Sequence, residues 1–236
     1  MTETSSYKRI LLKVSGELLS PSDNLQNPLY DLAASLKNLS QIGTEIAIVI
    51  GGGNIFRGRD AEKMCMDRTQ ADHAGLLATM INGIFLKQAL ENLDIETKVL
   101  SSVHIPQVFE TYNPLIGQKY LQEKKILIFV AGLGNTYFST DSAAVVKALE
   151  IKAEVLLKAT KVDGVYDKDP REKLAQKFSQ VSCSKILADR LHCMDMTAAA
   201  LAREQGLPII VFDLFEKESL QKVVEKKPVG TYVEGV

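Results

Sequence analysis

Short apolar runs that break at glycines and restart as amphipathic helices constrain the fold of this chain more than any other feature. The clearest run, Ile126 to Val130, is typical of a strand buried on both faces. It ends in a glycine-containing turn, residues 131–135, and Thr140 then begins an amphipathic helix. A helix N-terminus after such a turn presents backbone N–H groups and partial positive charge. The segment therefore predicts an anion site, with phosphate as the expected ligand.

The same alternation of strand and helix patterns continues along the whole chain. Apolar runs predict strands over 9–14, 46–50, 97–103, 126–130, 154–159, 208–212 and 231–233. Helical patterns follow Asn27-Pro28 and cover 69–92, 115–122, a segment from Thr140, 183–191, 195–205 and 219–224. In the long helix the expected inner face is Leu76, Leu77, Met80, Ile84 and Leu90. Repeated strand–helix–strand units predict an α/β fold with a mostly parallel sheet covered on both faces.

Composition and charge narrow the class of protein. The 236 residues show no linker or repeat, so we expect a single domain over 1–236, with residues 1–6 as a flexible N-terminus. The net charge of -1 does not favour nucleic-acid binding. No apolar run approaches the roughly 20 residues of a membrane helix, and no signal peptide is recognisable, so we expect no membrane partner and a cytoplasmic protein. Three scattered cysteines predict neither disulfides nor a zinc site.

Four predicted strands end in residues suited to bind phosphate. Ligands of open parallel sheets bind beyond the carboxyl ends of the strands. One strand ends in Lys13-Val14-Ser15-Gly16, and the next in Gly51-Gly52-Gly53-Asn54 with Arg57 close behind. The third is the turn at 131–135, and the fourth is the segment 158–166. Glycines let a backbone approach a ligand closely, and arginine can donate two hydrogen bonds to a phosphate. Neither the P-loop nor the dinucleotide-binding glycine motif is present.

These segments carry a resemblance to a known family. Lys13 to Gly16, Gly51 to Asn54 and Lys158 to Tyr166 resemble the amino-acid-kinase fold family. The segments 50–58, 72–79 and 134–141 are similar to those of its bacterial-type uridylate kinases, and the likeness spans residues 7–234. The resemblance implies a three-layer sandwich fold. It implies an enzyme of pyrimidine nucleotide biosynthesis that transfers the ATP γ-phosphoryl group to UMP, giving UDP and ADP.

The resemblance also implies site residues and partners. Lys13, Arg57 and Asp141 are the implied catalytic residues. The implied ATP-binding residues are Lys13, Val14, Ser15, Gly16, Gly53, Arg57, Thr160, Tyr166 and Asp169. The implied UMP-binding residues are Gly52, Asp72, Leu133, Gly134, Asn135, Thr136, Tyr137, Phe138, Ser139 and Thr140. Mg²⁺ is expected mainly on the ATP phosphates, with Asp195 either a metal ligand or a helix N-cap. A homohexamer and inhibition by UTP are further implications.

The sequence departs from the family pattern in two places. Relatives commonly read Thr-Gly-Asn-Pro-Phe-Phe-Thr-Thr-Asp where this chain has Leu133, Thr136, Tyr137 and Ser139 as differences. Any side-chain hydrogen bond at 133 is therefore absent, while Ser139 keeps a hydroxyl. The second departure is the segment 20–27, which lacks the glycine that relatives often carry in a region associated with GTP activation. The resemblance therefore leaves activation by GTP open.

Two alternatives remain open from the residues. A kinase of the same fold could act on a carboxylate or a carbamate, although the segments 72–79 and 134–141 disfavour it. A non-catalytic nucleotide-binding regulator would keep the glycine turns and tolerate loss of Lys13, Arg57 or Asp141, but all three are present.

Overall fold

A nine-stranded sheet forms the centre of the computed structural model, which describes residues 6–20, 27–57, 61 and 63–235. The strand order is β4-β3-β5-β2-β1-β6-β10-β11-β9, and β7 pairs with β8 in a separate antiparallel hairpin. Neighbouring strands in the sheet are parallel except β10 and β11. The strands are β1 (Arg9–Val14), β2 (Glu45–Ile50), β3 (Thr97–Ser101), β4 (Glu110–Thr111), β5 (Ile126–Val130), β6 (Val155–Thr160), β7 (Val165–Tyr166), β8 (Lys177–Phe178), β9 (Gln180–Ser182), β10 (Ile209–Asp213) and β11 (Thr231–Glu234).

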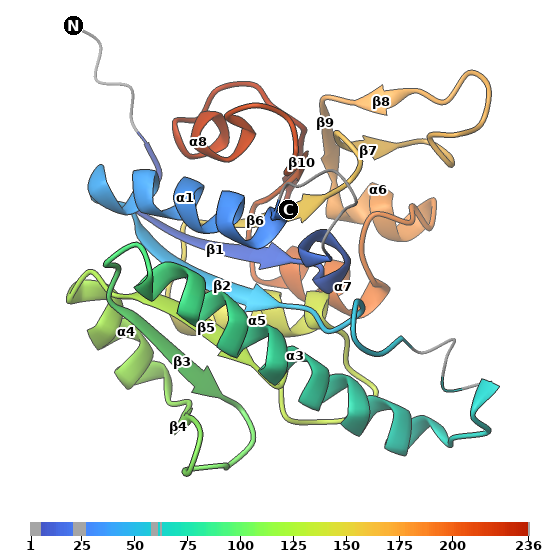
Figure 1. Ribbon diagram of the computed structural model, residues 1–236. Coiled ribbons are helices and arrows are strands. Elements are labelled where there is room, and N and C mark those ends of the chain that lie inside the picture. Colours follow the sequence, from blue (N-terminus) through green and yellow to red (C-terminus); the bar gives the residue numbers. More distant parts are fainter. Residues whose placement is uncertain (1–5, 21–26, 58–60, 62, 236) are drawn as a thin grey trace, which may run out of the picture.

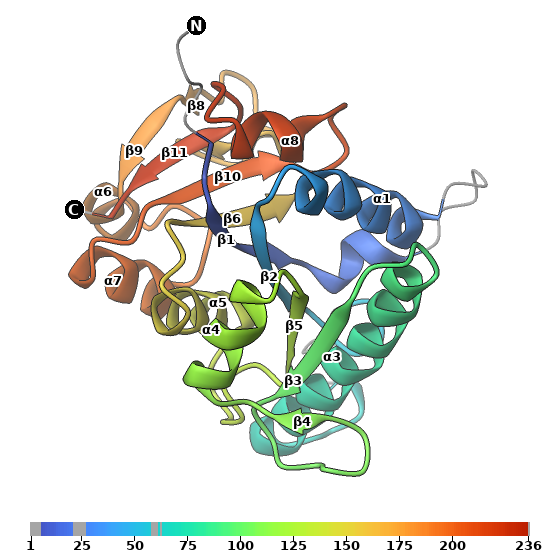
Figure 2. The same cartoon turned by 90° about the vertical axis from the view of Figure 1, so that its left-hand side faces the viewer.

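Helices cover both faces of this sheet (Figures 1 and 2). The helices are the 3-10 helix η1 (Gly16–Leu19), α1 (Pro28–Gln41), α3 (Arg68–Glu91), α4 (Pro114–Gln122), α5 (Thr140–Glu150), α6 (Cys183–Ala188), α7 (Met196–Glu204) and α8 (Ser219–Val224). One apolar core joins one face of the sheet to α1, α3 and α8. A second core joins the opposite face to α4, α5, α6 and α7. The predicted three-layer α/β sandwich with a mostly parallel sheet is confirmed.

The helices begin where the sequence places capping residues. Asn27 accepts a hydrogen bond from the Leu29 N–H, and proline follows as the first helical residue of α1. Asp67 caps α3 in the same way, and Ser139 caps α5. Strand β3 ends at Ser101, two residues before the predicted end, because the Ser101 hydroxyl bonds the Val103 N–H and carbonyl and turns the chain.

The expected inner face of the long helix is partly wrong. Leu77 and Ile84 are exposed, whereas Met80, Leu86 and Leu90 are buried against the sheet. Apolar residues lie on both sides of α3, so the sequence periodicity does not distinguish the side that packs on β5 and β3. Among the described residues, no helix is long and apolar enough to cross a membrane. Residues 1–5 and 21–26, which include most of the predicted N-terminal extension and most of the segment lacking glycine, lie outside the described residues.

Parallel pairing brings the predicted ligand segments together. Strands β5, β2, β1 and β6 are consecutive neighbours in the sheet and run in the same direction. Their carboxyl ends therefore meet at one edge, and the four turns predicted to bind phosphate follow these four strands. The fold thus assembles at one place what the sequence presents at four separate points.

Candidate active site

A buried carboxylate lies between two lysines at this edge of the sheet. Lys13 on β1 and Lys158 on β6 are register partners in the sheet, so their side chains leave the same face. Asp141, in the first turn of α5, forms ion pairs with both: its Oδ1 is 2.7 Å from Lys13 Nζ, and its Oδ2 contacts Lys158 Nζ. All three side chains are almost fully buried. We call Lys13, Asp141 and Lys158 the charge cluster.

Burial and charge act in opposite directions on the protonation of this cluster. Burial alone would raise the pKa of the Asp141 carboxyl, but the two ammonium groups outweigh it and hold that pKa at about 2. Burial lowers the pKa of the Lys158 ammonium, the Lys13 cation lowers it further, and Asp141 opposes both. At neutral pH the Asp141 carboxylate is therefore ionised and offsets one of two neighbouring cations. The cluster presents net positive charge to the edge of the sheet, as an anionic phosphoryl group requires.

The glycine turns after β1 and β2 pack backbone against backbone. A Cβ on Gly16 would lie 2.7 Å from the Gly51 carbonyl oxygen and 2.8 Å from the Gly53 nitrogen, so no other residue fits there. A Cβ on Gly53 would meet nothing closer than 3.6 Å. That contact, with the Glu17 side chain, is ordinary van der Waals contact, so packing does not require glycine at this position. The missing side chain instead lets the Gly53 backbone approach a ligand closely.

Arg57 is held beside these turns. Its Nε donates to the Gly53 carbonyl at 2.7 Å, and its Nη2 lies 3.1 Å from Glu17 Oε1 on η1. Both side chains are about one-third to two-fifths exposed. The structure thus brings Lys13, Gly16, Gly53 and Arg57 to one edge, as the sequence predicted.

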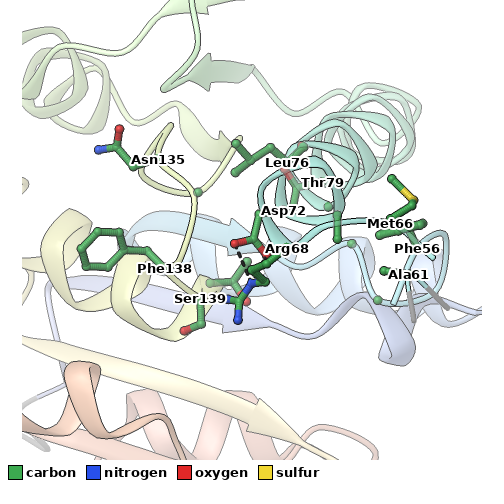
Figure 3. Close-up of a pocket in the computed structure, with 16 residues that line it drawn as sticks. Phe56, Ala61, Met66, Arg68, Asp72, Leu76, Thr79, Asn135, Phe138 and Ser139 are labelled. Atoms are coloured by element: carbon green, nitrogen blue, oxygen red, sulfur yellow. Dashed lines mark hydrogen bonds and ion pairs between the residues drawn. The ribbon is translucent and has the colours of Figure 1, made fainter. Parts of the chain in front are cut away.

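A cavity of about 610 Å³ opens between α3, the Gly52–Gly53 turn and residues 132–140, which we call the acceptor loop (Figure 3). Six residues predicted for UMP line it: Gly52, Asp72, Asn135, Phe138, Ser139 and Thr140. The predicted Leu133, Gly134, Thr136 and Tyr137 are not among its lining residues. Its wall also contains Gly53, which the resemblance placed along the ATP phosphates, and Arg68 and Thr79, which the sequence analysis did not single out.

Helix α3 fixes the position of both walls of this cavity. The buried Asn82 side-chain amide donates to the Gly51 carbonyl and to Asn54 Oδ1, each at 2.7 Å. One turn earlier, the Thr79 hydroxyl accepts from the Ala131 N–H at 2.7 Å. Ala131 has a φ of 61°, a conformation that costs a residue with a Cβ free energy and persists only where its surroundings hold it. Asn82 and Thr79 therefore set the geometry of the two turns. Thr79 ends the segment 72–79 that carries the family resemblance, whereas Asn82 lies outside it.

A second cavity, of about 800 Å³, lies beyond β6 beside the β7–β8 hairpin. The predicted Thr160, Tyr166 and Asp169 all line it. Tyr166 is oriented by a 2.8 Å hydrogen bond from its hydroxyl to Asp163. Lys168 and His192 also line this cavity, and no motif in the sequence points to either. Cys193 lies in the same wall, where burial raises the pKa of its thiol to about 11 and keeps it protonated at neutral pH.

The charge cluster adjoins both cavities along the chain. Thr140 lines the first cavity and immediately precedes Asp141, while Thr160 lines the second and follows Lys158 by two residues. Val14, predicted for ATP, has a fully buried side chain in the core, so it has only its backbone to offer a ligand. Each cavity therefore includes a residue within two positions of the charge cluster, an arrangement that suits the transfer of an anionic group between two bound molecules.

Asp195 serves as a structural cap in this structure. It accepts from the Ala198 N–H at 2.8 Å at the start of α7, from the Ser142 hydroxyl at 3.1 Å and from the Ser139 hydroxyl. It therefore ties the N-termini of α5 and α7 together. Within the described ranges there is no group of three or more His, Cys, Asp or Glu side chains that could hold a metal ion.

The fold and this site define a member of a known class of phosphoryl-transfer proteins. The chain belongs to the amino acid kinase family, whose model matches residues 8–213. Within that family it is 45% identical over 234 residues to a uridylate kinase of Protochlamydia amoebophila (strain UWE25), with 96% of this chain and 93% of the relative covered.

Solved structures give the same result. A UMP kinase from Bacillus anthracis matches with a TM-score of 0.93 at 33% identity, covering 98% of this chain and 97% of that one. A UMP kinase from Ureaplasma parvum matches with a TM-score of 0.90 at 35% identity, covering 98% of this chain and 100% of that one. The expected family and fold are therefore confirmed.

Proposed function

We propose that this chain is a UMP kinase that transfers the γ-phosphoryl group of ATP to UMP, giving UDP and ADP. The observation that carries the proposal is the charge cluster, whose residues adjoin in sequence the linings of two cavities, one of which contains most of the residues expected to hold UMP. The relatives named uridylate kinase and UMP kinase support the substrate.

In this reaction the protein mainly positions two nucleotides and neutralises charge. Lys13 and Arg57 reach the transferring group, while the ion pair with Asp141 orients Lys13. The backbone of Gly16 and Gly53 approaches the ATP phosphates, and Thr160, Tyr166 and Asp169 line the space for adenosine. Asp72 offers carboxylate oxygens to the vicinal ribose hydroxyls of UMP. No side chain needs to form a covalent intermediate.

Mg²⁺ accompanies ATP in this proposal and supplies charge neutralisation on its phosphates. The described residues support that assignment because Asp141 is already paired with two lysines and Asp195 is engaged in capping. We further propose that UTP inhibits the enzyme, since it shares the uracil and ribose of UMP. The three free cysteines support a cytoplasmic location. We further propose a single domain over 1–236, since both apolar cores of the described residues pack on one sheet, and a role in pyrimidine nucleotide synthesis, since UMP and UDP are pyrimidine nucleotides.

The proposal is tested by measuring ADP release from Mg-ATP with separate acceptors. We expect turnover with UMP and none with glutamate, acetylglutamate or carbamate. Turnover with one of the latter and not with UMP would make the chain a same-fold kinase of another substrate class. Nucleotide binding without ADP release from any acceptor would favour the non-catalytic regulator.

An exposed apolar stripe on α3 supports self-association, and we propose a homohexamer. Leu77, Ile81, Ile84 and Phe85 lie at helical spacing and are each more than 40% exposed. An apolar patch of this kind on a single chain typically marks an interface.

Placing charge on this stripe is expected to yield a smaller assembly. Ile81→Glu/Phe85→Glu would bury two carboxylates in the proposed interface, which costs several kcal/mol without partners. Sedimentation velocity should show a lower mass than the wild-type protein. Leu174→Glu is the matched control, because Leu174 is an exposed apolar residue outside α3, and it should leave the mass unchanged. An unaltered mass for the double variant would remove α3 from the interface.

A further inference from the structure

We propose that Arg68 and Tyr137 form a clasp around Asp72 that orders the acceptor loop before the nucleotide binds. This makes Arg68 a positioning residue for the acceptor nucleotide, and only the identity of that nucleotide rests on the proposed function. We call Arg68, Asp72 and Tyr137 the clasp. It joins the first turns of α3 to the acceptor loop, 65 residues away in sequence.

Three contacts close the clasp into a ring. Arg68 Nε donates to both Asp72 carboxylate oxygens at 2.8 Å (Figure 3). Asp72 Oδ2 also accepts from the Tyr137 backbone N–H at 2.7 Å. The Tyr137 ring in turn lies against the guanidinium, whose central carbon is 5.2 Å from the ring centroid. Each member of the clasp therefore contacts the other two.

The backbone of Tyr137 needs these contacts. Its φ is 68°, in the left-handed region that is uncommon for a residue with a bulky side chain. Its side chain is largely exposed, so burial in the core does not compensate for this conformation. The hydrogen bond to Asp72 and the stacking on Arg68 hold it in place. Loss of Arg68 is therefore expected to release this part of the acceptor loop.

The position of Arg68 also favours a role in the site over a role in helix stability. It is the first residue of α3, where the helix dipole disfavours a cation. Its side chain is 59% exposed, and ion pairs so exposed contribute little to folding. In the cavity wall, however, its charge offsets that of Asp72, which would otherwise repel an anionic nucleotide. Asp72 can still accept a ribose hydroxyl, because a carboxylate has about four acceptor positions.

Hydrogen exchange of the nucleotide-free protein tests the clasp without reference to activity. The Tyr137 amide should exchange about 10-fold faster in Arg68→Gln and in Tyr137→Leu, since an exposed ion pair and a cation–π contact each contribute modestly. Tyr137→Phe keeps the ring and should exchange like the wild type. Lys87→Gln, which removes the cation of another i,i+4 ion pair on α3, is the matched control and should leave the exchange rate of the Tyr137 amide unchanged. Unchanged exchange in both Arg68→Gln and Tyr137→Leu would overturn the proposal.

Kinetics separate positioning from catalysis. Arg68→Gln is expected to raise KM for UMP about 10-fold, with a smaller change in kcat and an unaltered KM for ATP. Adding Tyr137→Leu to Arg68→Gln should raise KM for UMP little further, because either single change already opens the clasp. A loss confined to kcat, or fully additive effects of the two changes, would overturn the clasp. If the wild type does not phosphorylate UMP at all, the proposed function fails while the exchange result still decides the inference.

Discussion

Replacing Lys13 with alanine is expected to lower turnover at least about 100-fold while the protein stays folded. The ammonium group lies in the charge cluster at the edge where the phosphoryl group is proposed to pass, so its loss removes charge stabilisation from the transition state. Folding should survive because Asp141 keeps Lys158 as its partner. The measurement is kcat with UMP and Mg-ATP, beside a urea unfolding curve.

A surface lysine provides the matched control for this variant. Lys119→Ala removes an exposed ammonium on α4 that pairs with Glu123, the residue that follows this helix. We expect its turnover to stay within about twofold of the wild type, as is usual for an exposed ion pair. Wild-type turnover in Lys13→Ala would exclude Lys13 from the mechanism, and an unfolded Lys13→Ala protein would assign it a structural role instead.

Much of the fold follows from local sequence patterns. Strands such as β5 and β2 are continuous apolar runs, and α1, α3 and α5 begin at capping residues that the sequence displays. The chemistry at the strand ends was predictable for the same reason, because glycines and cations directly follow those runs. These features depend only on residues that are close together in the sequence, so they can be predicted from a single sequence.

Features that depend on strand order could not be predicted in this way. Lys158 lies inside an apolar strand, and its meaning emerges only when β6 pairs with β1 and sets it beside Lys13. Arg68 similarly looks like an ordinary residue at a helix start until Tyr137, 69 residues later, packs on it. The inner face of α3 was partly mispredicted because that helix is apolar on two sides, of which the sheet covers one.

Asp141→Asn is expected to lose activity and also about 3 kcal/mol of stability at pH 7. The two lysines flanking Asp141 would remain almost fully buried without a counter-charge, and breaking a buried ion pair by removing one partner is strongly destabilising. Urea unfolding monitored by circular dichroism gives the free energy of unfolding, with an unchanged m-value showing that the unfolded state is comparable.

The pH dependence of this stability deficit identifies its cause. In the wild type the Asp141 pKa of about 2 lies below the unfolded value of about 3.9, so its stabilisation is present above pH 4 and fades as pH falls toward 2. The difference between wild type and variant should therefore shrink in acid. It should also shrink in alkali. A buried lysine whose pKa is lower in the folded than in the unfolded protein loses its proton first in the folded state, so the protein becomes more stable as pH rises from the folded pKa toward the unfolded pKa. A deficit independent of pH would indicate lost packing instead of unbalanced charge.

A second substitution distinguishes stability from catalysis in the same cluster. Asp141→Asn/Lys158→Met removes one of the two facing cations and puts an apolar side chain of similar length in its place. Since apolar replacements of buried ions are often neutral or stabilising, most of the lost stability should return. Activity should not return, because the pair that orients Lys13 and the second ammonium are both missing. A double variant no more stable than Asp141→Asn would refute the charge account, and one with restored turnover would show that phosphoryl transfer needs neither group.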